Sequence, residues 1–195
     1  MQDDYKNFDW EGFLQKLPIK KTKEDRAKRR QLWNAIDMNG NGYVSLAEFD
    51  RGIQDVLNLP HIFSLKKVLI RAYTASKNKI KAKSKHSKDY VEWLEFRILL
   101  IYLRQYFEYY AMFCRIDASD DFKVDFNEFK KALPTLEKWG IKITDPKAEF
   151  KKIDNNNNSG SIMFDEFCEY SIKKNLDLED DDDFDDEELK NFKSK

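Results

Sequence analysis

The sequence predicts an all-α protein built from repeated helix–loop–helix units. Apolar residues recur at three- and four-residue spacing in several segments, which is the period of an amphipathic helix. Only six glycines and four prolines occur in 195 residues, so few positions interrupt a helix. Short polar segments rich in Asp, Asn and Ser separate these apolar stretches. With 41% hydrophobic and 36% charged residues, the chain is typical of a soluble protein that buries a core.

The first polar segment, DMNGNGYVSLAE at 37–48, has the spacing of an EF-hand calcium loop. Such a loop places oxygen ligands at positions 1, 3, 5, 7 and 9 and a glutamate at 12, with glycine at 6 for a turn of positive φ. Gly42 stands at position 6 and Val44 at position 8, where an aliphatic residue pairs with a partner loop. The expected calcium ligands are Asp37, Asn39, Asn41, Tyr43 through its carbonyl, Ser45 and Glu48.

EF-hands pair, so a second hand is expected between residues 60 and 105. Val91 and Glu95 fit its positions 8 and 12, whereas the incoming helix predicts position 1 at Thr74. About ten extra residues, KNKIKAKSKH, fill the turn, and lysine cannot coordinate a cation, so this hand should bind no calcium. The insertion is either a solvated loop or a docking element for an acidic surface. The docking residues would be Lys77, Lys79, Lys81, Lys83, Lys85 and Lys88.

A third loop at 117–128, DASDDFKVDFNE, carries four ligand carboxylates. Its flaw is Phe122 at position 6, where a side chain in the left-handed region costs about 1–2 kcal/mol. That cost lowers calcium affinity roughly tenfold, and the extra negative charge offsets it. The expected ligands are Asp117, Ser119, Asp121, Lys123 through its carbonyl, Asp125 and Glu128.

A fourth loop, DNNNNSGSIMFDE, is one residue too long. Phe150 and Ile153 in the incoming helix set position 1 at Asp154, whereas Gly160 and Ile162 downstream count back to Asn155. Either Asn155 becomes the first ligand and a carboxylate is lost, or Asp154 keeps that place and the loop bulges. The candidate ligands are Asp154, Asn155, Asn157, Ser159, Ser161 and Glu166.

One continuous helix is expected to leave the second hand and enter the third. Between Ile98 and Cys114 fourteen of seventeen residues are apolar or aromatic, so this helix cannot stand free in water. The two lobes should therefore pack into one compact unit. The expected parts are an N-terminal arm at 1–20, lobes at 21–105 and 106–175, and an acidic tail at 176–195.

Charge is distributed unevenly along the chain. Residues 177–188 carry ten carboxylates and no base, so with a net charge of −1 the remainder sums to +9, concentrated at 20–30 and 77–88. The tail is expected to be disordered. Partners could be anionic, or the acidic tail could fold back on the basic body. Nucleic-acid binding is not expected, because the basic clusters lack interleaved aromatics and the tail opposes it.

Catalysis is not expected either. The chain has no phosphate-binding glycine loop, and His61 and His86 have no nucleophile nearby in the sequence. Cys114 and Cys168 lie singly in apolar helical stretches, which favours two small buried side chains over a zinc site or a disulfide. No apolar run reaches eighteen residues, and no secretory signal precedes the first helix, so an intracellular protein is expected.

The segments DYVEWLEFRILL and MFCRIDASDDFKVDFNEFKKALPTLEKWGIKITDP resemble the calflagins, flagellar calcium-binding proteins of protists, and the resemblance extends over residues 20–172. It implies a four-hand calcium sensor of the cilium or flagellum, without enzymatic activity, that changes contacts with a protein partner on binding Ca²⁺. Calflagins carry acyl groups on an N-terminal Gly and a nearby Cys; here Met1 precedes Gln2 and no cysteine precedes Cys114, so membrane anchoring is not expected.

A competing interpretation keeps the family and removes the calcium response. The protein would then be a constitutive structural component docked on axonemal microtubules, with the lysines of 77–88 facing acidic tubulin surfaces. Calcium-dependent exposure of apolar surface distinguishes the two, because a sensor shows it and a scaffold does not.

Overall fold

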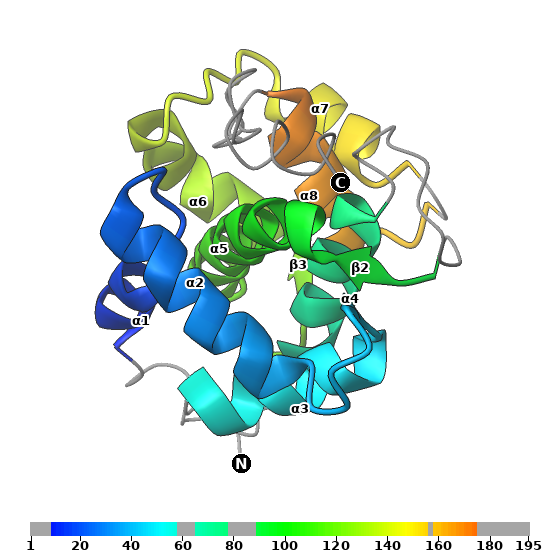
Figure 1. The fold of residues 1–195 in the computed structure, drawn as a ribbon. Coiled ribbons are helices and arrows are strands. Elements are labelled where there is room, and N and C mark those ends of the chain that lie inside the picture. The colour runs from blue at the N-terminus through cyan, green and yellow to red at the C-terminus, as the bar shows by residue number, and fades with distance from the viewer. Residues whose placement is uncertain (1–8, 58–64, 78–88, 156–157, 175–195) are drawn as a thin grey trace. The chain divides into compact units, whose positions relative to one another are not determined.

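The computed structural model describes residues 9–57, 65–77, 89–155 and 158–174, and the chain divides into two units within its longest helix (Figure 1). Unit 1 ends at Tyr106 and unit 2 begins at Phe107. The elements up to the boundary are α1 (Trp10–Lys16), α2 (Lys23–Ile36), β1 (Tyr43–Val44), α3 (Leu46–Leu57), α4 (Leu65–Ser76), β2 (Val91–Glu92) and α5 (Trp93–Ile116), which crosses it. The remaining elements are β3 (Lys123–Asp125), α6 (Phe126–Lys138), α7 (Pro146–Ile153), β4 (Ser161–Met163) and α8 (Phe164–Lys173).

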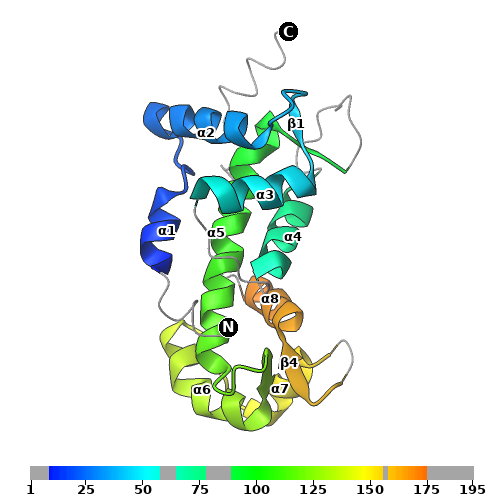
Figure 2. The same ribbon diagram turned by 90° about the horizontal axis from the view of Figure 1, so that it is seen from below.

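Helices α2 and α3 pack closely together in unit 1 (Figures 1 and 2). Thr22 caps α2 by accepting a hydrogen bond from the backbone N–H of Asp25 at 3.2 Å, and the inward face of α2 ends at the fully buried Ile36. Opposite lies Gly52 of α3, where an added Cβ would stand 2.7 Å from Cγ1 of Ile36. The close approach of the two helices therefore requires glycine at this position.

The segment that joins α1 to α2 is held by two arginines. Arg29, whose side chain is 1% exposed, donates to the carbonyls of Pro18 at 2.9 Å and Lys20 at 2.7 Å. Nε of Arg97 donates to the carbonyl of Ile19 at 2.6 Å. Arg29 belongs to the basic segment 20–30, which was expected to attract anionic partners. Its guanidinium instead binds backbone carbonyls of the same chain.

Each unit contains a pair of loops joined by a short antiparallel ribbon. In unit 1, β1 pairs with β2 so that Val44 lies opposite Val91; in unit 2, β3 pairs with β4 so that Val124 lies opposite Ile162. All four side chains are buried, and they are the residues expected at position 8 of the four loops. The predicted all-α fold of paired EF-hands is confirmed, and the loop of the second hand at 78–88 lies outside the described residues.

Helix α5 is the continuous helix expected between the second and third hands. Its 24 residues include side chains buried around the whole circumference, among them Leu99, Leu100, Leu103 and Phe107. No helix in the described ranges is both long and apolar enough to cross a membrane. Packing of the two lobes against each other stays a prediction.

Both cysteines are free thiols, and only one of them is fully buried. Cys168 in α8 is completely inaccessible, as expected of a small core side chain. Cys114 near the end of α5 is half-buried. The interpretation of both as buried hydrophobes therefore applies fully to Cys168 and in part to Cys114.

Candidate calcium sites

Loop 1 is organised around the carboxylate of Asp37, which follows the last residue of α2. Its Oδ1 accepts from the backbone N–H of Asn41 at 3.2 Å, and its Oδ2 from that of Gly42 at 3.1 Å. Gly42 has φ of +86°, the left-handed conformation that position 6 requires. Oδ1 of Asn39 accepts from Asn41 N at 2.9 Å, and Oδ1 of Asn41 accepts from Tyr43 N at 3.1 Å. The side-chain oxygens at positions 1, 3 and 5 thus hold successive backbone amides of the same turn.

The glutamate at position 12 closes loop 1 from the other side. Oε2 of Glu48 accepts from the Ser45 backbone N–H at 3.0 Å and from its hydroxyl at 2.7 Å, and Oε1 accepts from Nδ2 of Asn39 at 2.7 Å. The structure therefore brings the predicted ligands at positions 3, 9 and 12 into direct contact. Because Glu48 lies in the first turn of α3, its carboxylate connects the loop to the orientation of that helix.

Loop 3 repeats this geometry around Asp117. Oδ1 of Asp117 accepts from Asp121 N at 3.3 Å and Oδ2 from Phe122 N at 2.9 Å, matching Asp37 in loop 1. Glu128 accepts from the backbone N–H groups of Ser119 and Asp125, both at 2.9 Å. Burial raises the pKa of Asp117 above its ordinary value, and the hydrogen bonds from Phe122 and Asp121 oppose that shift.

Phe122 adopts the strained backbone that the sequence predicted, with φ of +62°. Its ring is half-buried and stacks on the ring of Tyr110, with the centroids 6.5 Å apart and an interplanar angle of 29°. An aromatic pair contributes about 0.5–1.5 kcal/mol beyond burial, which is comparable to the strain. The contact gives a physical reason for a phenylalanine at this position, and the sequence alone did not reveal it.

In loop 4 the carboxylate of Asp154 makes backbone contacts like those of Asp37 at position 1 of loop 1. Asp154 ends α7 with φ −72° and ψ 64°, close to the −75° and 71° of Asp37. Its Oδ1 accepts from Ser159 N and its Oδ2 from Gly160 N, both at 2.9 Å. Of the two alternatives that the sequence left open, these contacts favour the bulged loop, and the ligand set of loop 4 stays a prediction.

The remaining candidates of loop 4 keep the contacts that positions 5 and 12 make in loop 1, and they differ at position 9. Oγ of Ser159 donates to the carbonyl of Ser161 at 2.8 Å, so two predicted ligands contact each other. Glu166 is 3% exposed and accepts from Met163 N at 2.9 Å. Met163 itself stands at position 9 and has no oxygen on its side chain, a defect visible in the spacing that the sequence interpretation missed. Asn157 lies outside the described residues.

The second hand keeps the expected contact at the start of its outgoing helix α5, whereas its incoming helix α4 ends later than predicted. Oε2 of Glu95 accepts from Glu92 N at 3.1 Å, the same contact between positions 12 and 9 as in the other loops. Helix α4 continues through Thr74 to the buried Ser76, so the prediction of position 1 at Thr74 was wrong by three residues. The helix continues because its buried face, which includes Tyr73 and Ser76, extends another turn into the core.

Lys77 and Asp89, at the two ends of the lysine-rich insertion, contact each other; we call this contact the neck of the insertion. Nζ of Lys77 lies 3.7 Å from Oδ1 of Asp89 and 5.8 Å from the centroid of the Tyr73 ring. Lys77, predicted as a docking residue, is thus partly engaged within the chain. The other predicted docking residues, Lys79, Lys81, Lys83, Lys85 and Lys88, lie outside the described ranges, as does the acidic tail.

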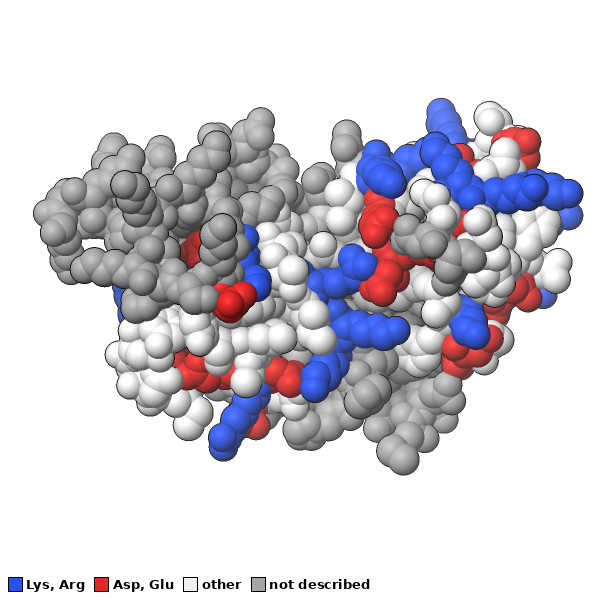
Figure 3. Space-filling view, turned by 90° about the vertical axis from the view of Figure 1, so that its right-hand side faces the viewer, with Lys and Arg blue, Asp and Glu red and all other residues white. Residues whose placement is uncertain are grey.

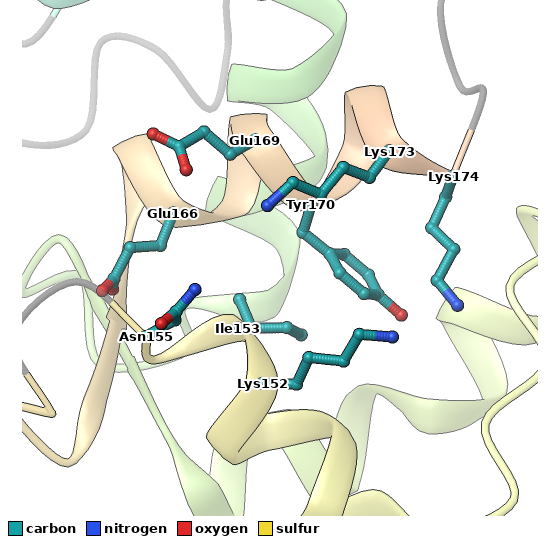
Figure 4. A pocket seen from close by; sticks show the side chains of 8 residues that line it. All are labelled: Lys152, Ile153, Asn155, Glu166, Glu169, Tyr170, Lys173 and Lys174. Atoms are coloured by element: carbon teal, nitrogen blue, oxygen red, sulfur yellow. The ribbon is translucent and has the colours of Figure 1, made fainter.

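A cavity of about 320 Å³ lies beside loop 4, between α7 and α8 (Figure 4). Beside it, Glu149 accepts from the Tyr170 hydroxyl at 2.8 Å and from Nζ of Lys174 at 3.0 Å, with Nζ of Lys152 at 3.8 Å. Burial would raise the pKa of Glu149, but these partners together hold that pKa below its ordinary value. The cavity is lined by Lys152, Ile153, Asn155, Glu166, Glu169, Tyr170, Lys173 and Lys174.

Within the described ranges, no three His, Cys, Asp or Glu side chains are gathered so that they could hold a metal by themselves. On the face drawn in Figure 3, lysines and arginines alternate with carboxylates over the described residues. The donor set of loop 1, two carboxylates with amide, hydroxyl and carbonyl oxygens, fits the hard Ca²⁺ ion in its chemistry.

The chain is similar to one family model and to several flagellar calcium-binding proteins. The model of the FCaBP EF-hand domain matches residues 13–103. A flagellar calcium-binding protein of Trypanosoma cruzi is 38% identical over 178 residues, covering 89% of this chain and 83% of that protein. The flagellar calcium-binding protein TB-24 of Trypanosoma brucei brucei is 35% identical over 171 residues, covering 86% and 77%. A solved homologue of programmed cell death 6 protein from Leishmania major Friedlin aligns with TM-score 0.40 at 21% identity, covering 80% and 77%.

Proposed function

This chain belongs to the flagellar calcium-binding protein family, and from that premise we propose that it is a calcium sensor of the flagellum that changes its contacts with a protein partner. Calcium is the ion common to the family's name and to the oxygen donors of the loops. The flagellar location is inferred from the relatives.

The observation that carries the proposal is the double role of Glu48. Its carboxylate contacts the predicted ligands Asn39 and Ser45, and its backbone is part of α3. The Ca²⁺ ion would be held by Asp37, Asn39, Asn41, Tyr43, Ser45 and Glu48. Its positive charge would balance the two loop carboxylates, which the N–H donors of the loop balance only in part. Oε1 of Glu48 accepts a hydrogen bond from Nδ2 of Asn39 in this structure. When a cation replaces that donor, the carboxylate of Glu48 moves, and the first turn of α3 shifts with it. Because α3 packs on α2, the shift changes the contact between the two helices. This supports a response in helix orientation, as in sensor EF-hands.

Tryptophans report this rearrangement. Trp33 of α2 lies edge-on to Trp93 of α5 with centroids 5.7 Å apart, and the guanidinium carbon of Arg30 is 3.5 Å from the centroid of Trp93. A change in the angle between the helices of the first and second hands alters both contacts. Tryptophan emission is therefore expected to change when loop 1 binds calcium.

The test is a calorimetric calcium titration of the full chain with magnesium present, with tryptophan emission recorded in parallel. The same titration is run on Glu48→Gln, Glu128→Gln and Glu166→Gln. We expect Glu48→Gln to remove one site and most of the spectral change, because the amide provides a single neutral oxygen where the carboxylate provides two charged ones. Binding without a spectral change, or no binding at all, would refute the sensor and favour the constitutive scaffold.

A further inference from the structure

Tyr73 occupies a position between the two loops of unit 1. Its side chain is 2% exposed, in the last turns of α4, and its ring lies 6.0 Å from that of Phe49 in α3. Its hydroxyl oxygen is 2.8 Å from the carbonyl oxygen of Val44 and 2.7 Å from that of Asp89. One side chain of the second hand thus contacts the backbone of both loops.

The contact with Val44 lies next to the metal-binding part of loop 1. Val44 follows Tyr43, whose carbonyl is the expected ligand at position 7, and it pairs with Val91 in the β1–β2 ribbon. The Tyr43 carbonyl lies in the peptide plane that ends at the Cα of Val44, and the Val44 carbonyl lies in the plane that begins there, so holding the second plane restricts the direction of the first. A shift at Val44 is transmitted to the ligand.

The contact with Asp89 connects the same hydroxyl to the end of the lysine-rich insertion. Asp89 is also 3.7 Å from Nζ of Lys77, so the two sides of the neck are joined twice. A phenol has one proton, and the two carbonyl oxygens therefore share a single donor. Burial raises the pKa of Tyr73 far above its ordinary value, which keeps that proton in place at physiological pH, while the hydrogen bond from the backbone of Val91 works against the rise.

We propose that Tyr73 is a positioning residue for the calcium site of loop 1, through which the second hand, without binding an ion itself, sets the calcium affinity of the first. The inference rests on the proposed calcium binding at loop 1 and adds a residue outside the ligand set. It assigns a role to the altered hand: its incoming helix supplies the donor that holds the backbone beside the position 7 ligand.

The test is the calcium Kd of loop 1 in Tyr73→Phe, measured by competition with a chromophoric chelator on the full chain. Loop 1 is identified as the site lost in Glu48→Gln. Tyr73→Phe removes the hydroxyl that the carbonyls of Val44 and Asp89 share. We expect the Kd to rise about tenfold, which is the effect of losing one buried hydrogen bond. Tyr170→Phe is the matched control: it removes a buried hydroxyl from unit 2 and should leave the loop 1 Kd unchanged.

The outcomes separate this inference from the proposed function. If the native chain and Glu48→Gln titrate identically, loop 1 binds no calcium and the proposed function fails. If loop 1 binds and folded Tyr73→Phe retains the native Kd, the inference alone is overturned. Should Tyr73→Phe not fold, 3-fluorotyrosine is placed at residue 73, because it keeps the ring and strengthens the donor. A loop 1 Kd changed at least twofold supports the inference, and an unchanged Kd overturns it.

Discussion

Replacing Asp154 by alanine tests which residue begins loop 4. The carboxylate of Asp154 is 6% exposed and accepts from the backbone N–H groups of Ser159 and Gly160 at 2.9 Å each. No such pair of contacts involves the side chain of Asn155, which is exposed in the described structure. Asp154→Ala should therefore destabilise unit 2, whereas Asn155→Ala should have little effect.

The magnitude follows from the two hydrogen bonds. A hydrogen bond to a charged group contributes about 1.5–3 kcal/mol, and desolvation of the buried carboxylate offsets part of the sum of two. The net expectation is a loss of about 2 kcal/mol in the free energy of opening of unit 2 for Asp154→Ala. For Asn155→Ala the expected change stays within about 0.5 kcal/mol, as for a surface substitution.

Hydrogen exchange read by mass spectrometry measures this difference for unit 2 alone. The full chain is studied in chelator, so that calcium affinity does not enter, and peptides from α7 and α8 report the opening free energy. An equal loss in both variants, or a larger one for Asn155→Ala, would show that the loop begins one residue later. Peptides from α2 and α3 serve as the internal control, since they belong to unit 1.

Two further predictions concern unit 2. Phe122→Gly removes both the strain of the left-handed backbone and the stacking on Tyr110, and these two effects on stability oppose each other. The calcium Kd of loop 3, measured calorimetrically, should therefore change by less than tenfold. A larger gain in affinity would mean that the stacking contributes nothing. Glu149 has a pKa held below its ordinary value by Lys174 and Tyr170, so its contribution to stability is complete above about pH 4.3 and is lost as pH falls through the lowered folded pKa. In Glu149→Gln, the free energy of unfolding measured with urea should fall less steeply as the pH is lowered into the acid range. An unchanged pH dependence would mean that other carboxylates cause the acid loss of stability.

The arrangement of the hands was predictable because it depends on local spacing. In the first and third loops position 1 follows directly from the incoming helix, and the left-handed backbone at Gly42, Phe122 and Gly160 follows from their common place at position 6. The pairing of Val44 with Val91 also follows, because an apolar side chain in a polar loop is buried only against its counterpart. These features require only neighbouring residues and the period of a helix.

Contacts between residues distant in the sequence had to come from the tertiary structure. Arg29 belongs to the basic segment that was expected to attract anionic partners, and its burial depends on the carbonyls of Pro18 and Lys20, nine to eleven residues away in the chain. The frame of loop 4 was undecided, because its two helices gave different registers and only the hydrogen bonds of Asp154 select one.

The sequence by itself determined the number, order and chemistry of the loops, since ligand types and spacing are properties of consecutive residues. Only the tertiary structure decided how the loops are held. Tyr73 is 29 residues from Val44 and 16 from Asp89, yet one hydroxyl serves both carbonyls. A hydrogen bond of this kind depends on where folded elements meet in space, and spacing along the chain does not encode that.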